Sequence, residues 1–189
     1  LRTIEELKPL SPGFVSVTMG AAGSTRTRTV DLVIQIQRDL GITTMAHLPC
    51  VGFEKSEIAG LLDQLESAGI RNVLALRGDA PREAADFVQP RDGFRFASEL
   101  VAFIHARGGF SVGGACYPEV HPQAASAKDD LRHLCKKVSA GADFLISQLF
   151  FDNQKFFDFE WRATGAGIAV PIVPGIMPIT SAAGVRRML

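Results

Sequence analysis

The chain has 189 residues, of which 47% are hydrophobic and 21% are charged. These fractions are close to the average of soluble globular domains, and the length is enough to bury one sizeable core. The 20 basic and 20 acidic residues cancel to a formal net charge of zero, which provides no general attraction to nucleic acids or anionic membranes. No apolar run is long enough to span a bilayer, and the start shows no signal-peptide pattern.

The three cysteines are odd in number and lack the spacing of metal ligands: Cys50, Cys116 and Cys135. Reduced thiols in a cytoplasmic protein explain this pattern best. No domain boundary or low-complexity tract interrupts the sequence. We therefore expect a single cytoplasmic domain over residues 1–189, with neither nucleic acid nor a membrane as its partner.

Six strand-like runs follow one another at intervals of about 27 to 38 residues, close to the ~30 residues of a βα unit. They begin near Phe14, Thr44, Asn72, Phe110, Phe144 and Pro171. Between them lie apolar stripes with helical spacing, namely Val30, Val33, Ile34 and Leu40; Ile58, Leu61, Leu62 and Leu65; Leu100, Val101 and Ile104; Leu131, Leu134 and Val138; Phe156, Phe157 and Trp161. Five glycines are expected to end these helices: Gly41, Gly69, Gly108, Gly141 and Gly165.

Six consecutive βα units predict a parallel sheet with helices outside it. The fold is then either a doubly wound open sheet or a (β/α)₈ TIM barrel. Neither the Gly-x-Gly-x-x-Gly motif nor the Walker phosphate loop of nucleotide-binding open sheets is present, which favours the barrel. A complete barrel takes about 250 residues and eight strands. The sequence therefore predicts an α/β fold, an incomplete TIM barrel of about six βα units without its first and last strands.

The strand near Asn72 ends abruptly in Arg77-Gly78-Asp79. Ligands of parallel sheets gather at the carboxyl ends of the strands, so this tripeptide marks a candidate site. A structural ion pair between Arg77 and Asp79 is the alternative interpretation. The irregular stretch from Ala80 to Arg95 follows this strand and is expected to lie over the ligand face.

If all strand ends face one pocket, that pocket receives the polar side chains Thr18, His47, Arg77, Asp79, Tyr117, Glu119, His121 and Gln148. Two histidines and a carboxylate among them suggest a metal-dependent lyase or hydrolase as an alternative, although no two of these ligands share a compact spacing. Gln148 interrupts an apolar run, where an unpaired amide would be costly. This position favours ligand recognition over packing as the role of Gln148.

The expected helix from Ala124 to Ala140 carries polar residues beside its apolar stripe. Their charges and donors suit a diphosphate, and the alternative is a solvated helix face. Both interpretations stay open for this row: Asp130, His133, Lys136 and Lys137.

Several segments, taken together, closely resemble the methylenetetrahydrofolate reductase family. They are residues 14–18, 46–48, 75–79, 117–122, Gln148 and 171–178, in the same order as in the family and through nearly the whole chain. Single motifs are moderately specific, whereas the ordered set is very specific. The resemblance implies an FAD-dependent oxidoreductase that reduces 5,10-methylenetetrahydrofolate to 5-methyltetrahydrofolate in one-carbon metabolism and methionine biosynthesis. NADH or NADPH would be the co-substrate, and a homo-oligomer is compatible with the resemblance. The non-enzymatic alternative is a flavin- or folate-binding module.

Carried over by position, the resemblance implies an FAD site formed by Thr18, His47, Arg77, Gly78, Asp79, Ala97, Tyr117, His121, Ala124, Asp130, His133, Lys136 and Lys137. It also implies that Asp79 is catalytic and contacts the folate, that Gln148 binds the folate, and that no metal is held. The family's general acid is a glutamate on the first strand, which is expected to be missing here. Residues 1–189 alone are therefore not expected to be active. Phe96 stands where bacterial relatives often have tyrosine, which removes one hydroxyl contact.

Overall fold

The computed structural model describes residues 2–19, 26–79 and 87–186. Its centre is a six-stranded sheet in which all neighbouring strands are parallel. The strands follow the chain order without a reversal: β1 (Val15–Val17), β2 (Thr44–Pro49), β3 (Asn72–Leu76), β4 (Ser111–Cys116), β5 (Phe144–Ser147) and β6 (Ile172–Val173). A doubly wound sheet reverses its strand order at a switch point. The observed order therefore excludes that alternative.

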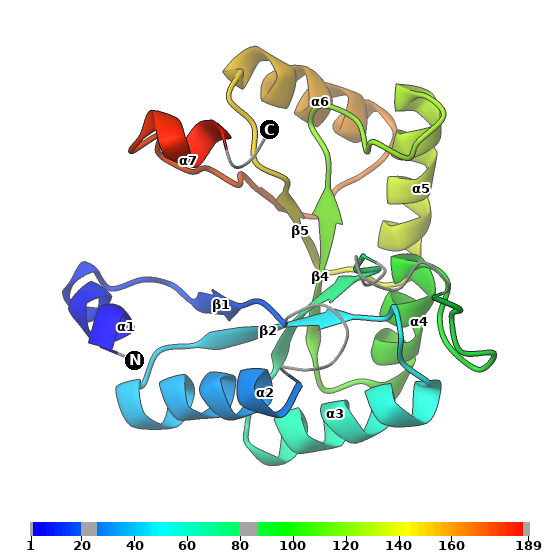
Figure 1. Ribbon diagram of the computed structural model, residues 1–189. Helices are drawn as coiled ribbons and strands as arrows, with labels where there is room; N and C mark the ends of the chain where they lie inside the picture. Colours follow the sequence, from blue (N-terminus) through cyan, green and yellow to red (C-terminus); the bar gives the residue numbers. More distant parts are fainter. Residues whose placement is uncertain (1, 20–25, 80–86, 187–189) are drawn as a thin grey trace.

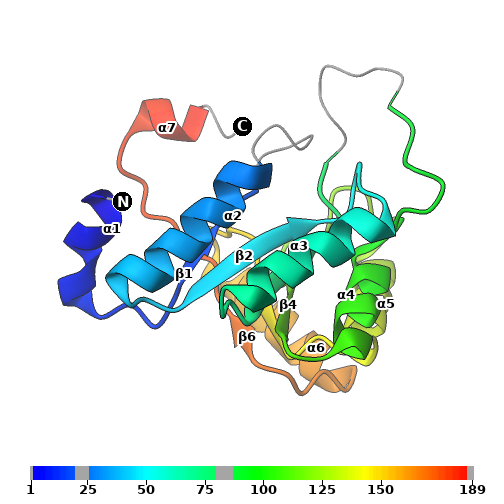
Figure 2. The same ribbon diagram turned by 90° about the horizontal axis from the view of Figure 1, so that it is seen from below.

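The sheet is curled, and the helices α2 to α6 form an arc around its outer face (Figure 1). Figure 2 shows α2 and α3 on the same side of β2, with α1 and α7 on the side of the open edge. The helical segments are α1 (Arg2–Leu7), η1 (Lys8–Leu10), α2 (Arg26–Gln35), the π-helical η3 (Ile36–Leu40), α3 (Lys55–Ser67), α4 (Ala97–Arg107), α5 (Ala127–Ser139), α6 (Asn153–Gly165) and α7 (Ala182–Arg186). In the described part of the chain, β1 and β6 each have one neighbouring strand and do not pair with each other.

The main core lies between the sheet and the helices α2 to α4. Ala46 and Leu48 of β2 are buried against this layer together with Leu62 and Ile104 of the helices. Because side chains alternate along a strand, His47 points to the opposite, inner face. A smaller core under α5 and α6 contains Cys116, Leu134 and Phe159, among other residues. The main core thereby holds β3 in place, and the smaller core holds the carboxyl end of β4.

The strand predictions are confirmed to within one residue, and four of the five apolar stripes lie mostly in the core. The stripe of α6 is wrong in two of its three residues: Phe156 is buried as predicted, whereas Phe157 and Trp161 are exposed and Phe159 and Ala163 are buried in their place. The helix end at Gly165 is also wrong. Gly165 is the last helical residue, and Gly167 adopts the left-handed conformation with φ 86° instead.

The three cysteines are free, as expected from the sequence, and Cys50 and Cys116 are buried. Burial raises the pKa of the Cys50 thiol to about 11 and that of the Cys116 thiol to about 12, so both are protonated at neutral pH. Among the described residues, no helix combines the length and the hydropathy that a membrane span requires.

Candidate active site

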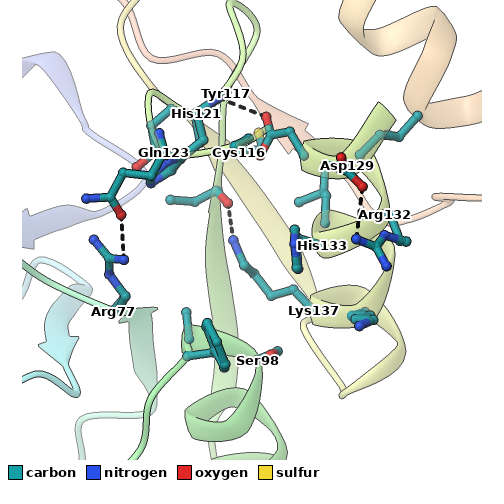
Figure 3. Close-up of a pocket in the computed structure, with 18 of the residues that line it drawn as sticks. Arg77, Ser98, Cys116, Tyr117, His121, Gln123, Asp129, Arg132, His133 and Lys137 are labelled. Carbon is teal, nitrogen blue, oxygen red and sulfur yellow. Dashed lines mark hydrogen bonds and ion pairs between the residues drawn. The ribbon is translucent and has the colours of Figure 1, made fainter. Parts of the chain in front are cut away.

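A cavity of about 760 Å³ lies at the carboxyl ends of β3 and β4. One wall is the start of α4, and the other is the face of α5 from Asp129 to Lys137 (Figure 3). We call this cavity the α4–α5 groove. Eleven of the thirteen residues expected to bind FAD line it: Arg77, Gly78, Asp79, Ala97, Tyr117, His121, Ala124, Asp130, His133, Lys136 and Lys137. The structure thus brings together residues from four separate segments of the chain.

The end of β3 brings its backbone unusually close to the turn after β2. Gly78 has φ 80°, and a Cβ atom there would lie 2.8 Å from both Pro49 Cβ and Val51 Cγ1. Only glycine combines this conformation with this approach at low cost. The tight passage fixes the directions in which the side chains of Arg77 and Asp79 leave the strand.

Arg77 and Asp79 do not pair with each other in the structure. The guanidinium group of Arg77 is half-buried, and its Nη1 donates to Gln123 Oε1 at 2.6 Å. Its Nε donates to the Gly78 carbonyl at 3.3 Å. The Asp79 side chain is exposed. The interpretation of this tripeptide as a simple ion pair is therefore wrong, and the carboxylate of Asp79 is available to a ligand at the mouth of the groove.

The turn after β4 orients His121 through its backbone and its ring. Val120 adopts a left-handed conformation with φ 73°, which is rare and costly for a β-branched residue. The His121 N–H donates to Asp130 Oδ2 at 3.1 Å, and the ring of Tyr117 lies edge-on to the imidazole with 4.5 Å between ring centroids. Burial, with a smaller contribution from Asp79, raises the pKa of Tyr117, so its phenol remains a hydrogen-bond donor.

The imidazole of His121 has a defined tautomer. The backbone N–H of Gln123 donates to His121 Nδ1 at 3.0 Å, so that nitrogen carries no proton in the neutral ring. The proton is then on Nε2. The residue offers a hydrogen-bond donor, which suits a negatively charged or carbonyl-bearing ligand.

Helix α5 contributes the cationic wall of the groove. Ser126 caps the helix by accepting the Asp129 N–H at 3.1 Å, so the helix begins at Ala127. The predicted start at Ala124 is wrong, and Ala124 lies in the preceding turn. The ammonium group of Lys137 donates to the Ala115 carbonyl at the end of β4, and burial lowers its pKa. On the same helix, His133 and Lys136 are exposed and line the groove, which is compatible with both predicted interpretations of this row, a diphosphate site and a solvated face.

Three predicted site residues lie outside the α4–α5 groove. Thr18 is exposed just after β1, and His47 is half-buried on the inner face of β2, where it lies beside Leu74 of β3. Burial lowers the pKa of His47 and favours its neutral form. Gln148 is also exposed rather than buried in a strand, and its Oε1 accepts the Leu149 N–H at 2.9 Å. These three residues lie outside the groove, and the single pocket that receives every strand end stays a prediction, because the described strands form an open sheet and not a closed barrel.

Glu119 was also expected in that pocket, and its side chain points elsewhere. It forms an ion pair with Lys155 of α6 at 2.6 Å, and both side chains are exposed. The pair links the turn after β4 to α6. Glu119 thus stabilises the rim and does not line the groove.

The metal-dependent alternative finds no ligand set in residues 2–19, 26–79 and 87–186, where no group of three or more His, Cys, Asp or Glu is placed to hold an ion. His47 points to the inner face of the sheet, whereas His121 lines the α4–α5 groove. The described residues thus offer His47 and His121 in different surroundings and no third ligand beside either of them.

Gln123 lines the groove and binds Arg77, although it was not among the residues predicted from the sequence. It directly follows the predicted segment 117–122, which was the available signal. A second cavity of about 560 Å³ shares Arg77, Gly78, Asp79 and Gln123 with the groove. Phe87, Gln89, Phe94 and Arg95 also line it, so the described part of the stretch from Ala80 to Arg95 lies beside the end of β3, and its place over a ligand stays a prediction. Residues 80–86 of that stretch are outside the described residues.

Comparisons with known proteins decide the family. Residues 1–189 match the methylenetetrahydrofolate reductase family profile over their whole length. The chain belongs to this family. It is 41% identical over 188 residues to methylenetetrahydrofolate reductase (NADH) 1 of Zea mays, a match that covers 94% of this chain and 32% of the relative. With 5,10-methylenetetrahydrofolate reductase of Escherichia coli (strain K12) it shares 38% over 179 residues, covering 95% of this chain and 58% of the relative.

The chain therefore spans about a third of the plant reductase and less than two thirds of the bacterial one. The family resemblance predicted from the ordered motifs is confirmed. The groove residues lie within the matched segment, so the family comparison covers the whole candidate site.

Solved structures resemble the fold at low sequence identity. A putative lyase/mutase from Burkholderia cenocepacia J2315 has a TM-score of 0.58 and 19% identity, covering 98% of this chain and 74% of that chain. Oxaloacetate acetylhydrolase in complex with oxalate has a TM-score of 0.59 and 16% identity, covering 97% and 68%. At these identities the similarity concerns the fold alone, and the names carry no argument about function.

Proposed function

We propose that the full-length protein reduces 5,10-methylenetetrahydrofolate to 5-methyltetrahydrofolate, with FAD as its cofactor and NADH or NADPH as the electron donor. The observation that carries the proposal is the gathering of eleven expected FAD-binding residues in one groove of a family member. The plant relatives are named for NADH, which makes NADH the first donor to test.

The chemistry of the groove fits the ADP part of FAD. Arg77 and Lys137 bring cationic donors to the two sides of a cavity that is large enough for a nucleotide. The carboxylate of Asp130 is half-buried beside them and could accept hydrogen bonds from ribose hydroxyls. His121 adds a donor through Nε2. Bound FAD would supply the hydride transfer from the nicotinamide nucleotide to the folate.

We further propose that residues 1–189 are one part of a (β/α)₈ barrel domain. The unreversed parallel order, the curled sheet and the helices on its outer face support this. The two edge strands β1 and β6 would then pair with further strands. In that arrangement Thr18 and His47, on or next to the inner face, would approach the flavin ring, and Gln148 would approach the folate.

Asp79 is the residue that we assign to the reaction. Its exposed carboxylate at the mouth of the groove can accept hydrogen bonds from the amino edge of a pterin. Its negative charge would also disfavour further negative charge on a nearby reduced ring. Both substrates would use the same face, which predicts that they bind in alternation with ping-pong kinetics. A homo-oligomer and a cytoplasmic location remain predictions.

The test uses anaerobic stopped-flow measurements on the full-length protein. Wild-type protein should co-purify with flavin, which NADH reduces and 5,10-methylenetetrahydrofolate reoxidises. Asp79→Asn should slow reoxidation by the folate by at least about tenfold more than reduction by NADH, because it removes a charge that the folate contacts. Equal losses in both half-reactions would remove Asp79 from the folate step. A protein without flavin that carries zinc instead would contradict the proposed function.

A further inference from the structure

The α4–α5 groove and the second cavity share the side chains of Arg77 and Gln123, which are joined by a hydrogen bond. Both are lined by Arg77, Gly78, Asp79 and Gln123. Arg77 comes from the end of β3 and Gln123 from the turn after β4, and their side chains join at 2.6 Å (Figure 3). Both residues of this hydrogen bond therefore line a cavity of about 760 Å³ and one of about 560 Å³.

Two hydrogen bonds within the protein engage donors of Arg77 that an anionic ligand would use. Nη1 of Arg77 donates to the Gln123 amide, and Nε donates to the Gly78 carbonyl. Guanidinium groups bind phosphates best with two parallel N–H donors. Arg77 carries five N–H donors, and these two bonds engage one nitrogen of each edge that could form a fork, so a phosphate competes with Gln123 for the edge formed by Nη1 and Nη2.

Gln123 is anchored at its backbone and displaceable at its side chain. Its N–H is fixed by His121 Nδ1 at 3.0 Å, whereas its side chain is exposed. A neutral amide oxygen is also a weaker acceptor for a guanidinium group than a phosphate oxygen is. A phosphate that enters the groove can therefore replace the amide without disturbing the turn that carries it.

We propose that the Gln123 side chain is a latch on Arg77, and that a diphosphate-containing ligand competes with it for the guanidinium group and displaces it. Release of the latch turns the guanidinium of Arg77 to the diphosphate and joins the two cavities into one site. The identity of the ligand as FAD rests on the proposed function, whereas the competition for Arg77 requires only a diphosphate.

The test measures binding to the full-length protein by isothermal titration calorimetry, with FAD, ADP, inorganic pyrophosphate and adenosine as ligands. Gln123→Ala should tighten the binding of the three diphosphate-containing ligands by about 3- to 10-fold, because no hydrogen bond has to be broken first. Adenosine should bind both proteins equally. Gln123→Glu should weaken diphosphate binding, because a carboxylate pairs with Arg77 more strongly and repels phosphate.

Two controls separate competition from a general structural effect. Gln154→Ala removes an exposed glutamine of α6 that bonds Asp158, away from the groove, and should leave the affinities unchanged. In the Arg77→Ala background, Gln123→Ala should no longer change the affinity for ADP, because the two residues act on one contact. A gain that persists without Arg77 would overturn the latch.

The outcomes also separate the latch from the proposed function. Unchanged or weaker binding of ADP by Gln123→Ala would overturn the latch and leave the FAD assignment intact. Failure of the wild-type protein to bind FAD, together with tighter pyrophosphate binding by Gln123→Ala, would overturn the FAD assignment and support the latch. Failure of both proteins to bind all the diphosphate-containing ligands would overturn both.

Discussion

The two halves of the predicted site differ in how completely the protein forms them. In the α4–α5 groove, polar side chains have partners from other segments, as with Arg77 and Gln123, Asp130 and His121, and Lys137 and the Ala115 carbonyl. At the inner face and the edge of the sheet, Thr18 and Gln148 are exposed. The protein's own contacts therefore hold most of these groove side chains in place, and the proposed exchange at Arg77 replaces one such contact. In the proposed barrel, the other half would be completed by strands that pair with β1 and β6, each of which has one neighbouring strand in the described part of the chain.

This contrast suggests a division of labour within the cofactor site. A preorganised groove reduces the entropic cost of holding the diphosphate and the nucleotide. In the proposed reaction, the exposed residues would then adapt to two substrates that bind in alternation. The following substitutions test whether the halves are separable in this way.

The largest effect is expected for Gly78→Ala, which should lower the free energy of unfolding by about 2–4 kcal/mol. The new methyl group would be forced into a left-handed backbone and would lie 2.8 Å from carbon atoms of Pro49 and Val51. Urea unfolding measures the change. Gly60→Ala is the matched control, because its Cβ meets nothing within 4 Å in α3, and it should stabilise the protein by about 0.5–1 kcal/mol. Equal effects of both substitutions would show that the backbone at β3 is not constrained.

The second prediction concerns the groove alone. Lys137→Met should weaken FAD binding by about 10- to 100-fold, because it removes a charged donor from the diphosphate site and keeps the apolar stem. Fluorescence quenching of added flavin gives the affinity. Lys128→Met changes an exposed lysine of the same helix that does not line the groove and should leave the affinity unaltered. If both variants lose affinity alike, the general charge of α5 matters rather than the placement of Lys137.

The third prediction concerns the opposite half. Gln148→Ala in the full-length protein should raise the KM for the folate by about tenfold, since one hydrogen bond to the substrate is lost. The affinity for FAD should change by less than about twofold, because Gln148 lies outside the groove. Steady-state kinetics and flavin titration supply the two numbers. Release of FAD from this variant would show that the halves are not separable.

The smallest effect is a pH dependence that comes from His47. Burial lowers its pKa in the folded protein below the ordinary value of 6.5, so the unfolded chain takes up the proton first. The contribution of His47 to stability is therefore complete above about pH 6.5 and is lost as the pH falls through the folded-state pKa. The urea midpoint of wild-type protein should decrease in this window. His47→Asn should lack that part of the decrease, and identical profiles for both proteins would contradict the burial argument.

Much of the fold was readable because buried parallel strands are short apolar runs that end in polar residues. The starts at Thr44, Asn72 and Phe144 coincide with the structure. The stripe of α6 was misread because aromatic residues suggest burial, whereas helical spacing turns Trp161 outwards and Ala163 inwards.

The sequence predicted many residues of the candidate site, but it did not predict which of them line the groove and which lie outside it. The ordered motifs identified eleven residues that line the groove, but a sequence does not state which face of the sheet a strand end serves. The bond between Arg77 and Gln123 joins residues 46 positions apart, and such a contact exists only in the folded chain. Local pattern likewise placed Gln148 inside a strand, although β5 ends at Ser147.

The most direct test of the account is a crystal structure of the full-length protein with FAD bound. The account predicts that the diphosphate lies in the α4–α5 groove within hydrogen-bond distance of Arg77 and Lys137, and that Gln123 no longer contacts Arg77. A diphosphate bound outside this groove, with the bridge between Arg77 and Gln123 intact, would contradict it.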